Sequence, residues 1–239
     1  MSHHAERDEQ ALQPPPVSDV EPAAHVHIID DDASIREAIG SLLSTVHLET
    51  SIYASAREFI SARRPDVPGC ILLDVRLPGG QTGLELQEHF VNLGIHLPVI
   101  LVTGYGDVEM SVRAMKAGAI DFLTKPIRAQ DLIEAVARAI QRDRKRRSRD
   151  AALLSLREKS DTLTAREKRI MALVTAGHLN KQVAWRLGIT EAAVKLSRGA
   201  VMRKMAATSL ADLVRMADQL GVREAQLEQI GLSAALPDR

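Results

Sequence analysis

The sequence predicts an α/β domain built on a doubly wound, five-stranded parallel sheet, followed by an all-α domain of four helices. In the first part of the 239 residues, five short apolar runs alternate with segments of helical spacing. That alternation is typical of a parallel sheet covered by helices on both faces. In the second part, capping residues and glycines mark successive helices, with no strand pattern between them.

The composition is that of folded globular domains. Hydrophobic residues make up 45% of the chain and charged residues 26%, so disorder is not the general expectation. No apolar run approaches the ~20 residues needed to cross a bilayer, and the N-terminus has no hydrophobic signal core. The single cysteine, Cys70, excludes an intramolecular disulfide and is interpreted as a small core residue. We therefore expect a cytoplasmic protein without a membrane partner.

The charge is balanced over the whole chain but uneven along it. Residues 24–142 carry 11 Lys and Arg against 15 Asp and Glu, whereas residues 161–222 carry 10 against 5. Residues 143–160 are the most basic stretch, with 7 against 3. An acidic first domain joined to a basic second one suggests that the two domains meet different partners.

These patterns divide the chain into five segments. They are a disordered tail over 1–23, a first domain over 24–142, a charged linker over 143–160, a second domain over 161–222 and a C-terminal tail over 223–239. The linker allows two interpretations. It continues the last helix of the first domain, because no Gly or Pro occurs between Pro126 and Gly177, or it is flexible, because its basic run has no apolar stripe.

The first domain should gather polar side chains at one edge of its sheet. The strand candidates are residues 25–29, 47–52, 70–74, 97–103 and 119–124. Two capping boxes, Ser34 with Glu37 and Ser55 with Glu58, are expected to start the first two helices. Chemistry in such sheets gathers at the carboxyl ends of the strands. The polar residues at these ends are Asp30, Asp31 and Asp32 after the first strand, Asp74 after the third, Thr103 after the fourth and Lys125 after the fifth.

The motifs IIDDD, DVRLPG, VTG and DFLTKP at these strand ends resemble the receiver domain of bacterial response regulators, a flavodoxin-like fold. The resemblance covers residues 25–140. It implies that Asp74 accepts a phosphoryl group from a sensor histidine kinase, and that Asp30, Asp31, Asp74 and the backbone carbonyl of Arg76 hold Mg²⁺.

The residue types suit that chemistry independently. A carboxylate that attacks a phosphoryl group approaches another anion, so a divalent cation and a lysine must neutralise both. Lys125 can supply the positive charge, and the Thr103 hydroxyl can hydrogen-bond a phosphoryl oxygen. Asp32 is expected instead to face the start of the following helix, where negative charge is favoured.

Switching is expected from the same edge. If Thr103 moves toward a phosphorylated Asp74, it vacates space that an aromatic ring can enter, and Phe122 matches the aromatic switch position of the family; alternatively, Phe122 is simply a core residue. The surface formed by residues 107–128 would then change shape, and the resemblance implies that it forms a homodimer.

Two departures from the family pattern concern the lifetime of the phosphorylated state. The loop PGGQTG contains one residue more than usual near Gly80, before Gly83. Tyr105 occupies a position that faces the phosphorylation site in this family, where we hypothesise that it slows the entry of water.

The second domain is expected to contain a helix-turn-helix. A third capping box, Thr164 with Glu167, starts its first helix; the next is closed by Gly188, and the third runs from Thr190 to about Met205. A fourth helix is expected over residues 210–220, before Gly221. Trp185 is interpreted as core packing between the two short helices.

The stretch from residue 163 to residue 205 resembles the LuxR-type DNA-binding domain, and the whole chain resembles FixJ/NarL-family transcriptional regulators. A helix-turn-helix places its second helix in the major groove. The predicted DNA contacts are Lys195, Leu196 and Gly199 in the groove, with Lys181, Arg198 and Arg203 on phosphates. Ala193 and Ser197 stand where the family often has Thr and His, so the target sequence cannot be inherited from relatives.

The leading hypothesis is therefore a bacterial two-component regulator that dimerises on phosphorylation, binds promoter DNA and activates transcription through RNA polymerase. It would be no enzyme beyond its own phosphoryl transfer and dephosphorylation. One alternative is a constitutive DNA-binding regulator whose receiver needs no phosphate. Another is a hydrolase with a phosphoenzyme at Asp74, but such hydrolases need a second acid where this chain has Arg76.

Overall fold

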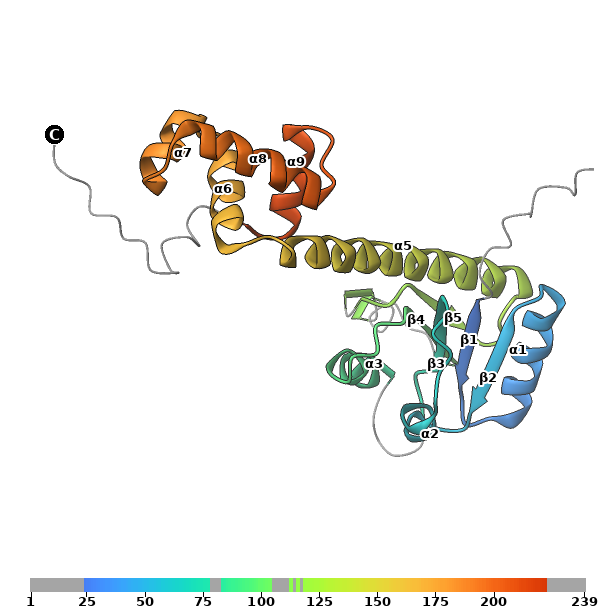
Figure 1. Ribbon diagram of the computed structural model, residues 1–239. Coiled ribbons are helices and arrows are strands. Elements are labelled where there is room, and N and C mark those ends of the chain that lie inside the picture. The colour runs from blue at the N-terminus through green and yellow to red at the C-terminus, as the bar shows by residue number, and fades with distance from the viewer. Residues whose placement is uncertain (1–23, 78–82, 105–111, 114, 117, 223–239) are drawn as a thin grey trace, which may run out of the picture. The chain divides into compact units, whose positions relative to one another are not determined.

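The computed structural model of the chain describes residues 24–77, 83–104, 112–113, 115–116 and 118–222 (Figure 1). The chain forms two compact units, Met1–Lys145 and Arg146–Arg239. No helix in the described ranges is both long enough and apolar enough to span a membrane.

The first unit is built on a five-stranded sheet in which every pairing is parallel, with strand order β2-β1-β3-β4-β5. The strands are β1 (His25–Ile29), β2 (Glu49–Tyr53), β3 (Gly69–Asp74), β4 (Val99–Thr103) and β5 (Asp121–Thr124). The helices that alternate with them are α1 (Ala33–Thr45), α2 (Ala56–Ser61), α3 (Gly83–Asn92) and α5 (Ala129–Asp161). The predicted doubly wound sheet is confirmed.

Two hydrophobic cores cover the two faces of this sheet. Successive strand side chains point to opposite faces, so Leu72 of β3 packs with α1 and α5, whereas Leu73 packs with α2 and α3. Cys70 lies in the first core, where burial raises the pKa of its thiol, as expected for a structural rather than a nucleophilic cysteine. Because helices cover both faces, we expect the polar functional side chains of the unit at the ends of the strands.

The start of α1 differs from the predicted capping box. The N-cap is Asp32 and not Ser34: the Asp32 carboxylate accepts hydrogen bonds from the amides of Ser34, at 2.8 Å, and Ile35, at 3.4 Å. Asp32 is in the extended conformation and the helix begins one residue later, so Ser34 already lies within the first turn. The expectation that Asp32 faces the following helix is confirmed.

The other two capping predictions are closer to the structure. Ser55 caps α2 through the amide of Glu58, but the Glu58 carboxylate accepts from the amide of Ala54 and not from Ser55 itself. Thr164 and Glu167 form the complete reciprocal capping box at the start of the helix that follows α5.

A close contact lies at the amino ends of β1 and β3. A Cβ atom at Gly69 would stand 2.3 Å from the carbonyl oxygen of His25, so no larger residue fits there without a shift of the backbone. The Gly69 amide donates to the carboxylate of Asp143, a fully buried residue of α5, at 3.1 Å. This bond ties the basic part of α5 to the sheet.

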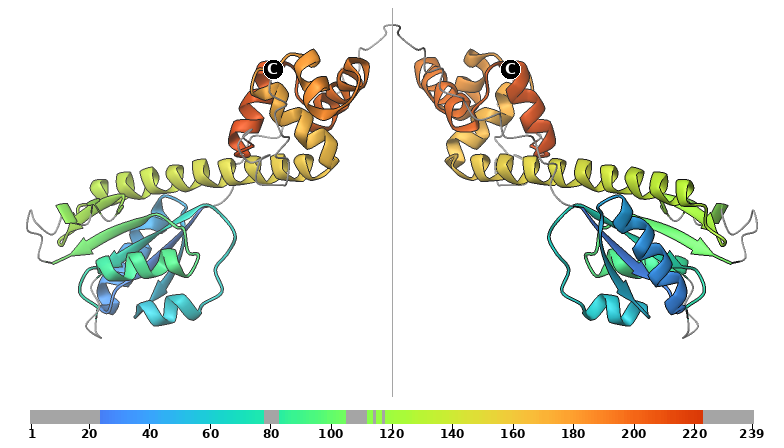
Figure 2. Two further views of the ribbon diagram at one scale, coloured as in Figure 1. Left: turned by 90° about the vertical axis from the view of Figure 1, so that its left-hand side faces the viewer. Right: turned by 90° about the vertical axis from the view of Figure 1, so that its right-hand side faces the viewer.

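Helix α5 continues without a break through the charged segment. It contains 33 residues and passes through the whole run QRDRKRRSRD, as the views in Figure 2 show. Of the two interpretations of the linker, the helical one therefore describes the structure.

The second unit contains four further helices: α6 (Ala165–Thr175), α7 (Asn180–Leu187), α8 (Glu191–Met205) and α9 (Leu210–Gln219). One core joins Leu156 of α5 to α6, α8 and α9, and another joins α6, α7 and α8. Gly188 closes α7 in the left-handed conformation, with φ of 62°, and Thr190 caps α8. The predicted helix-turn-helix is thus formed by α7 and α8.

The interpretation of Trp185 as a core residue was wrong. Its side chain is 69% exposed, whereas Val183 and Ala184 of the same helix are buried. At 3.6 residues per turn, Trp185 stands about 200° around the helix from Val183 and turns away from the core.

Candidate functional site

Three carboxylates meet at the carboxyl edge of the sheet. Asp30 follows β1 and Asp74 ends β3; both are buried, whereas Asp31 is exposed. Each of the three offers a carboxylate oxygen within 4.8 Å of the others. The sequence placed Asp30 and Asp74 more than forty residues apart, and the parallel pairing of β1 with β3 brings them together.

Lys125 bridges the two buried acids. Its Nζ donates to Asp30 Oδ2 at 2.7 Å and to Asp74 Oδ2 at 2.6 Å. Burial alone would lower the pKa of Lys125, but the two carboxylates outweigh it and hold that pKa above its usual value. Burial raises the pKa of Asp30, although the hydrogen bonds from Lys125 and from the Asp32 amide act to lower it. The ammonium group is therefore firmly charged, and it compensates two carboxylates at once.

Backbone amides hold the remaining oxygens of the same two acids. The amide of Asp32 donates to Asp30 Oδ1 at 2.9 Å, and the amide of Arg76 donates to Asp74 Oδ1 at 3.0 Å. Each buried carboxylate thus has one oxygen on a backbone amide and the other on Lys125. Both side chains are held in a fixed orientation before any substrate arrives.

Arg36 is a site residue that the sequence reasoning missed. Its Nη1 donates to the backbone carbonyl of Asp30 at 2.6 Å from the first part of α1. This contact fixes the turn that carries the three consecutive acids and places a second positive charge beside them. The only sequence signal was the position of Arg36 four residues after Asp32, one turn into the helix.

The donor set suits a hard divalent cation. Asp30, Asp31 and Asp74 provide oxygen atoms only, which Mg²⁺ prefers, and the exposure of Asp31 leaves room for the water ligands that Mg²⁺ usually keeps. Arg76, the fourth predicted ligand through its carbonyl, is exposed and lies two residues after Asp74, the last residue of β3. These residues would hold the ion beside the Asp74 carboxylate.

Thr103 lies on β4, which pairs with the strand of Asp74, and Phe122 lies on β5, the strand beyond it. Thr103 is fully buried at the end of β4, and its carbonyl accepts from the amide of Lys125 at 2.7 Å. Phe122 is half buried and packs at the border of the core that contains α2 and α3. Phe122 thus packs against the core without being fully buried in it, and its switch role stays a prediction.

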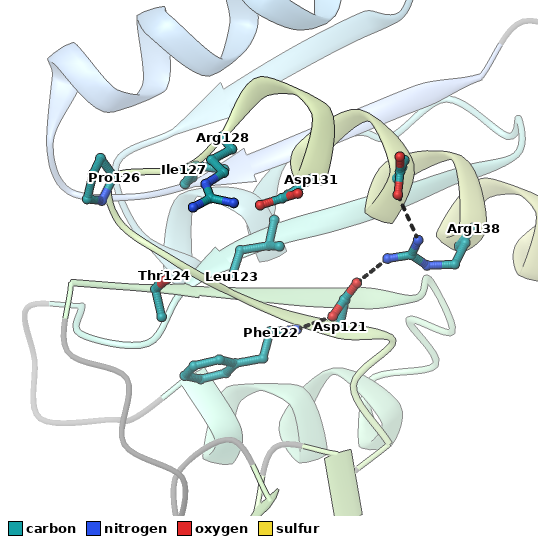
Figure 3. A pocket seen from close by; sticks show the side chains of 10 residues that line it. Asp121, Phe122, Leu123, Thr124, Pro126, Ile127, Arg128, Asp131 and Arg138 are labelled. Atoms are coloured by element: carbon teal, nitrogen blue, oxygen red, sulfur yellow. Dashed lines mark hydrogen bonds and ion pairs between the residues drawn. The ribbon is translucent and has the colours of Figure 1, made fainter.

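A pocket of about 540 Å³ lies between β5 and the start of α5, next to Lys125. Figure 3 shows Phe122 and Leu123 on opposite sides of β5, and Arg138 bonded to Asp121. The pocket has charged walls of both signs, with Arg128 and Asp131 among them. It overlaps the predicted dimer surface over residues 107–128.

Two predictions lie outside the described residues. The longer loop around Gly80 and the position of Tyr105 both fall in unplaced segments. Their effects on the phosphorylated state stay predictions.

In the second unit, α8 exposes most of the predicted groove residues. Val194, Val201 and Met205 form its buried side. Lys195, Leu196 and Arg203 are exposed, and the Leu196 side chain reaches 80%. With Gly199, these residues occupy the side of α8 that faces away from the core, because each lies at least about 100° from Val194.

The remaining predicted cations are placed differently. Lys181 is exposed near the start of α7. Arg198 is half buried, and its Nη1 lies 3.4 Å from Asn180 Oδ1, so it stands beside α7 and apart from the exposed side of α8. Lys204, the neighbour of Arg203, donates to Glu167 at 2.7 Å and holds α8 against α6.

Comparison with known proteins matches one family model to each of the two units. The family model described as response regulator receiver domain matches residues 26–137, and the model for bacterial regulatory proteins of the luxR family matches residues 161–217. The chain belongs to the FixJ/NarL family of response regulators. It is a two-component transcriptional regulator, with a receiver domain and a LuxR-type helix-turn-helix domain.

Relatives share this organisation along most of the chain. Nodulation protein W of Bradyrhizobium diazoefficiens is 48% identical over 206 residues, which cover 86% of this chain and 90% of the relative. Response regulator protein TodT of Pseudomonas putida is 39% identical over 83% of this chain and 87% of its own. The solved structure of the response regulator StyR is 38% identical, with a TM-score of 0.72, and the match covers 82% of this chain and 99% of that one.

The family assignment indicates which ligands and partners the two sites have in general. Receiver domains bind Mg²⁺ at an acidic cluster of the kind formed by Asp30, Asp31 and Asp74. A receiver domain implies a kinase as partner, and a LuxR-type domain implies DNA binding.

Proposed function

We propose that this regulator accepts a phosphoryl group on Asp74 from a sensor histidine kinase and, once phosphorylated, dimerises and activates transcription from promoter DNA. The observation that carries the proposal is the bridge from Lys125 to both Asp30 and Asp74, with Asp31 alongside. Such an arrangement brings together a nucleophile, a positive charge for the transferred group and the ligands of a divalent cation.

Asp74 is the nucleophile in this proposal. One of its carboxylate oxygens forms the new bond to phosphorus while the bond from phosphorus to the kinase histidine breaks. A bound Mg²⁺ would neutralise the charge of the phosphoryl oxygens. Lys125 is already 2.6 Å from Asp74, so its ammonium needs only a small movement to reach a phosphoryl oxygen. The Thr103 hydroxyl is assigned to another of these oxygens.

Signal transmission uses the strand and helix that follow this site. Lys125 comes directly after β5, and α5 begins four residues later. Movement of Thr103 and Phe122 on phosphorylation would reshape the surface over residues 107–128. The exposed apolar side chains of Val112 and Met115 on this surface, 45% and 50% exposed, favour its use in a homodimer.

The output is assigned to α8. Its exposed side enters the major groove, with Lys195, Leu196 and Gly199 at base edges. Lys181, Arg198 and Arg203 contact phosphates, and RNA polymerase is the expected partner at the promoter. Phosphorylation and DNA binding both favour the dimer, so each strengthens the other. The regulator performs no chemistry on other substrates in this proposal.

The test is phosphorylation of the full chain with acetyl phosphate and Mg²⁺, followed by intact-mass and peptide mapping. We expect one phosphoryl group on Asp74, none without a divalent cation and none in Asp74→Asn. Phosphorylation at another residue, or none at all, would refute the assignment.

The constitutive alternative is distinguished in cells. If target expression in an Asp74→Asn strain equals that of the wild type, the regulator acts without phosphate and the alternative holds. Under the proposal, expression in this strain stays at the unstimulated level even when the kinase is active.

A further inference from the structure

The sheet of the first unit has an open edge at β2. This strand is the last one on its side of the sheet, beyond β1, and β5 is the last on the other side. The Tyr53 carbonyl of β2 accepts from the amide of Asp30 at 3.2 Å, so Tyr53 turns its backbone groups toward β1. Successive strand residues alternate in this direction, so Thr50 and Ile52 turn their N–H and C=O groups away from the sheet. Within the described part of the chain, these four groups have no hydrogen-bond partner.

The strand β2 lacks features that commonly protect such an edge. Its sequence, ETSIY, contains no Pro or Lys, and its register with β1 runs through all five residues without a bulge. Natural edge strands often use these features to prevent pairing with another chain. The Ile52 side chain is 48% exposed, and Thr, Ile and Tyr are residue types that favour strands. The edge is thus suited to pairing with a further strand.

The strand β2 is also complementary to itself in the antiparallel direction. If the two-fold axis that relates two chains passes beside Ser51, Thr50 lies opposite Ile52 of the second copy. Thr50 and Ile52 are the residues with outward backbone groups, so the two Thr50–Ile52 pairs can exchange four hydrogen bonds, as an antiparallel ladder requires. A register shifted by one residue would instead set outward groups against inward ones.

The side chains agree with this register. A Cβ atom at Gly40 of α1 would stand 3.6 Å from Thr50 Oγ1, so Thr50 and Ile52 lie on the side of the sheet that α1 covers. There Ile52 meets Thr50 of the second copy, a pair of β-branched residues that packs well between strands. Glu49, the only charged residue of β2, meets Tyr53. The two Glu49 residues are then about 13 Å apart along the strands, beyond the Debye length of about 8 Å at physiological salt.

We propose that β2 pairs with β2 of a second copy in the antiparallel direction, so that two receiver sheets become one. This pairing needs no phosphorylation and goes beyond the proposed function. The proposed homodimer surface over residues 107–128 includes β5, at the opposite edge of the sheet. One chain can therefore form both contacts, and two different two-fold contacts join dimers into longer assemblies. Phosphorylated dimers would then hold one another on neighbouring DNA sites.

The association is measured with the full chain in an Asp74→Asn background, which excludes the phosphorylation dimer. A contact between two five-residue strands is smaller than standard protein interfaces, so we expect a Kd between about 10 µM and 1 mM. Sedimentation velocity across this range should show monomers at low concentration and pairs of chains at high concentration.

Amide exchange locates the contact. In the ¹⁵N-labelled chain, the amides of Thr50 and Ile52 should exchange quickly while the chain is monomeric. When nine-tenths of the chains are paired, their exchange should slow by about tenfold, because it then proceeds through the remaining monomer. The Ser51 amide, which points toward β1, is the internal control and should be protected at every concentration.

Two variants remove the contact by different routes. Ile52→Lys places on the edge a charge that natural edge strands often carry, and it should weaken the association by at least about tenfold. Thr50→Pro removes an outward N–H that the monomer does not use, at the kind of position where edge strands accept Pro. Val91→Lys of α3, at a side chain that is 56% exposed, is the matched control and should associate like the parent chain.

Exchange of the Thr50 and Ile52 amides that does not change with concentration would overturn the inference. So would protection of both amides in the monomer, because another segment of the chain would then cover the edge. Undiminished association of both Ile52→Lys and Thr50→Pro would overturn it as well.

Phosphorylation of the wild type separates the two contacts. It should produce assemblies of four chains or more, whereas phosphorylated Ile52→Lys should stop at dimers. Assemblies of the same size in both would overturn the inference. If unphosphorylated chains pair through β2 but phosphorylation adds no further association, the homodimer of the proposed function fails and the β2 contact stands.

Discussion

The two candidate sites of this regulator differ in the burial of their side chains. At the carboxyl edge of the receiver sheet, charged side chains are buried and hold one another: Lys125 contacts Asp30 and Asp74 within 2.7 Å. On α8 the side chains proposed to contact DNA are exposed, as with Lys195 and Leu196. The contacts of the first site form when the receiver unit folds. The proposed contacts of the second site form only when DNA is bound.

This difference predicts how mutations will act. A change at the receiver edge leaves a buried charge without compensation, so it alters chemistry and stability together. A change on the exposed side of α8 removes a contact that forms only with DNA, so binding should fall while stability stays the same.

The largest effect is expected for Lys125→Met. Phosphorylation of Asp74 by acetyl phosphate should slow by at least about a hundredfold, because a preorganised positive charge is lost. The affinity for Mg²⁺ should rise, since no ammonium then competes for Asp30 and Asp74. Stopped-flow phosphorylation and calorimetric titration with Mg²⁺ measure the two quantities. Lys116→Met, at an exposed position, is the control and should change neither; equal rates in both variants would contradict the role of Lys125.

Acid should destabilise the receiver unit before the DNA-binding unit. Burial, together with His25 and Arg64, lowers the pKa of His27 to about 4, and its Nδ1 lies 3.3 Å from the Tyr53 hydroxyl. His27 must fold uncharged, so between pH 6.5 and about 4 the unfolded state binds more protons than the native state. The free energy of unfolding should therefore fall as the pH drops through this window, by up to about 3 kcal/mol.

The acid effect can be measured in each unit by hydrogen exchange with mass spectrometry between pH 4 and 7. His27→Asn keeps a polar atom near Nδ1 but cannot gain the charge, so the pH dependence of the receiver unit should become shallower. A slope that His27→Asn leaves unchanged would place the acid sensitivity elsewhere.

Substitutions of two lysines of α8 should have different effects, one on DNA binding and the other on thermal stability. Lys195→Ala should weaken DNA binding by about 1 to 3 kcal/mol with no change in melting temperature, because Lys195 is exposed. Lys204→Ala should instead lower the melting temperature, since Lys204 donates to Glu167 and to the Thr162 carbonyl. Fluorescence anisotropy with labelled duplex and thermal unfolding check both, and the reverse pattern would contradict the assignment of α8.

The smallest effect is expected for Gly199→Ala. An added Cβ meets only Arg203 Nη1, at 3.7 Å, so the fold accepts it and the helix should gain up to about 1 kcal/mol. Gly40→Ala of α1, where the nearest atom is Thr50 Oγ1 at 3.6 Å, should stabilise its own unit similarly. Only Gly199→Ala should weaken DNA binding, if the backbone of α8 approaches the groove closely; equal DNA binding by both variants would mean that it does not.

The sequence predicted best what depends on local pattern and topology. The ends of the strands could be predicted from the short apolar runs. The parallel order of the strands then places Asp30 and Asp74 at the same edge of the sheet. The contact of Arg36 with the Asp30 carbonyl could not be predicted in this way, because it depends on where a long side chain turns after the helix is placed. The bond between Asp143 and Gly69 joins residues 74 positions apart and left no local signal.

The misplacement of Trp185 has a different cause. Its size and apolar character suggested burial, but Val183, Ala184 and Leu187 already define the packed side of α7, and Trp185 is out of phase with them. Helical phase would have found the exposed ring from the sequence alone.

The central claim is that phosphorylation of Asp74 and DNA binding are coupled. The most direct test measures the affinity of the full chain for its target duplex with and without acetyl phosphate and Mg²⁺, in the wild type and in Asp74→Asn. We predict that phosphorylation tightens binding by about 5- to 150-fold in the wild type and has no effect in Asp74→Asn. Equal affinities of the phosphorylated and unphosphorylated wild type would contradict the account.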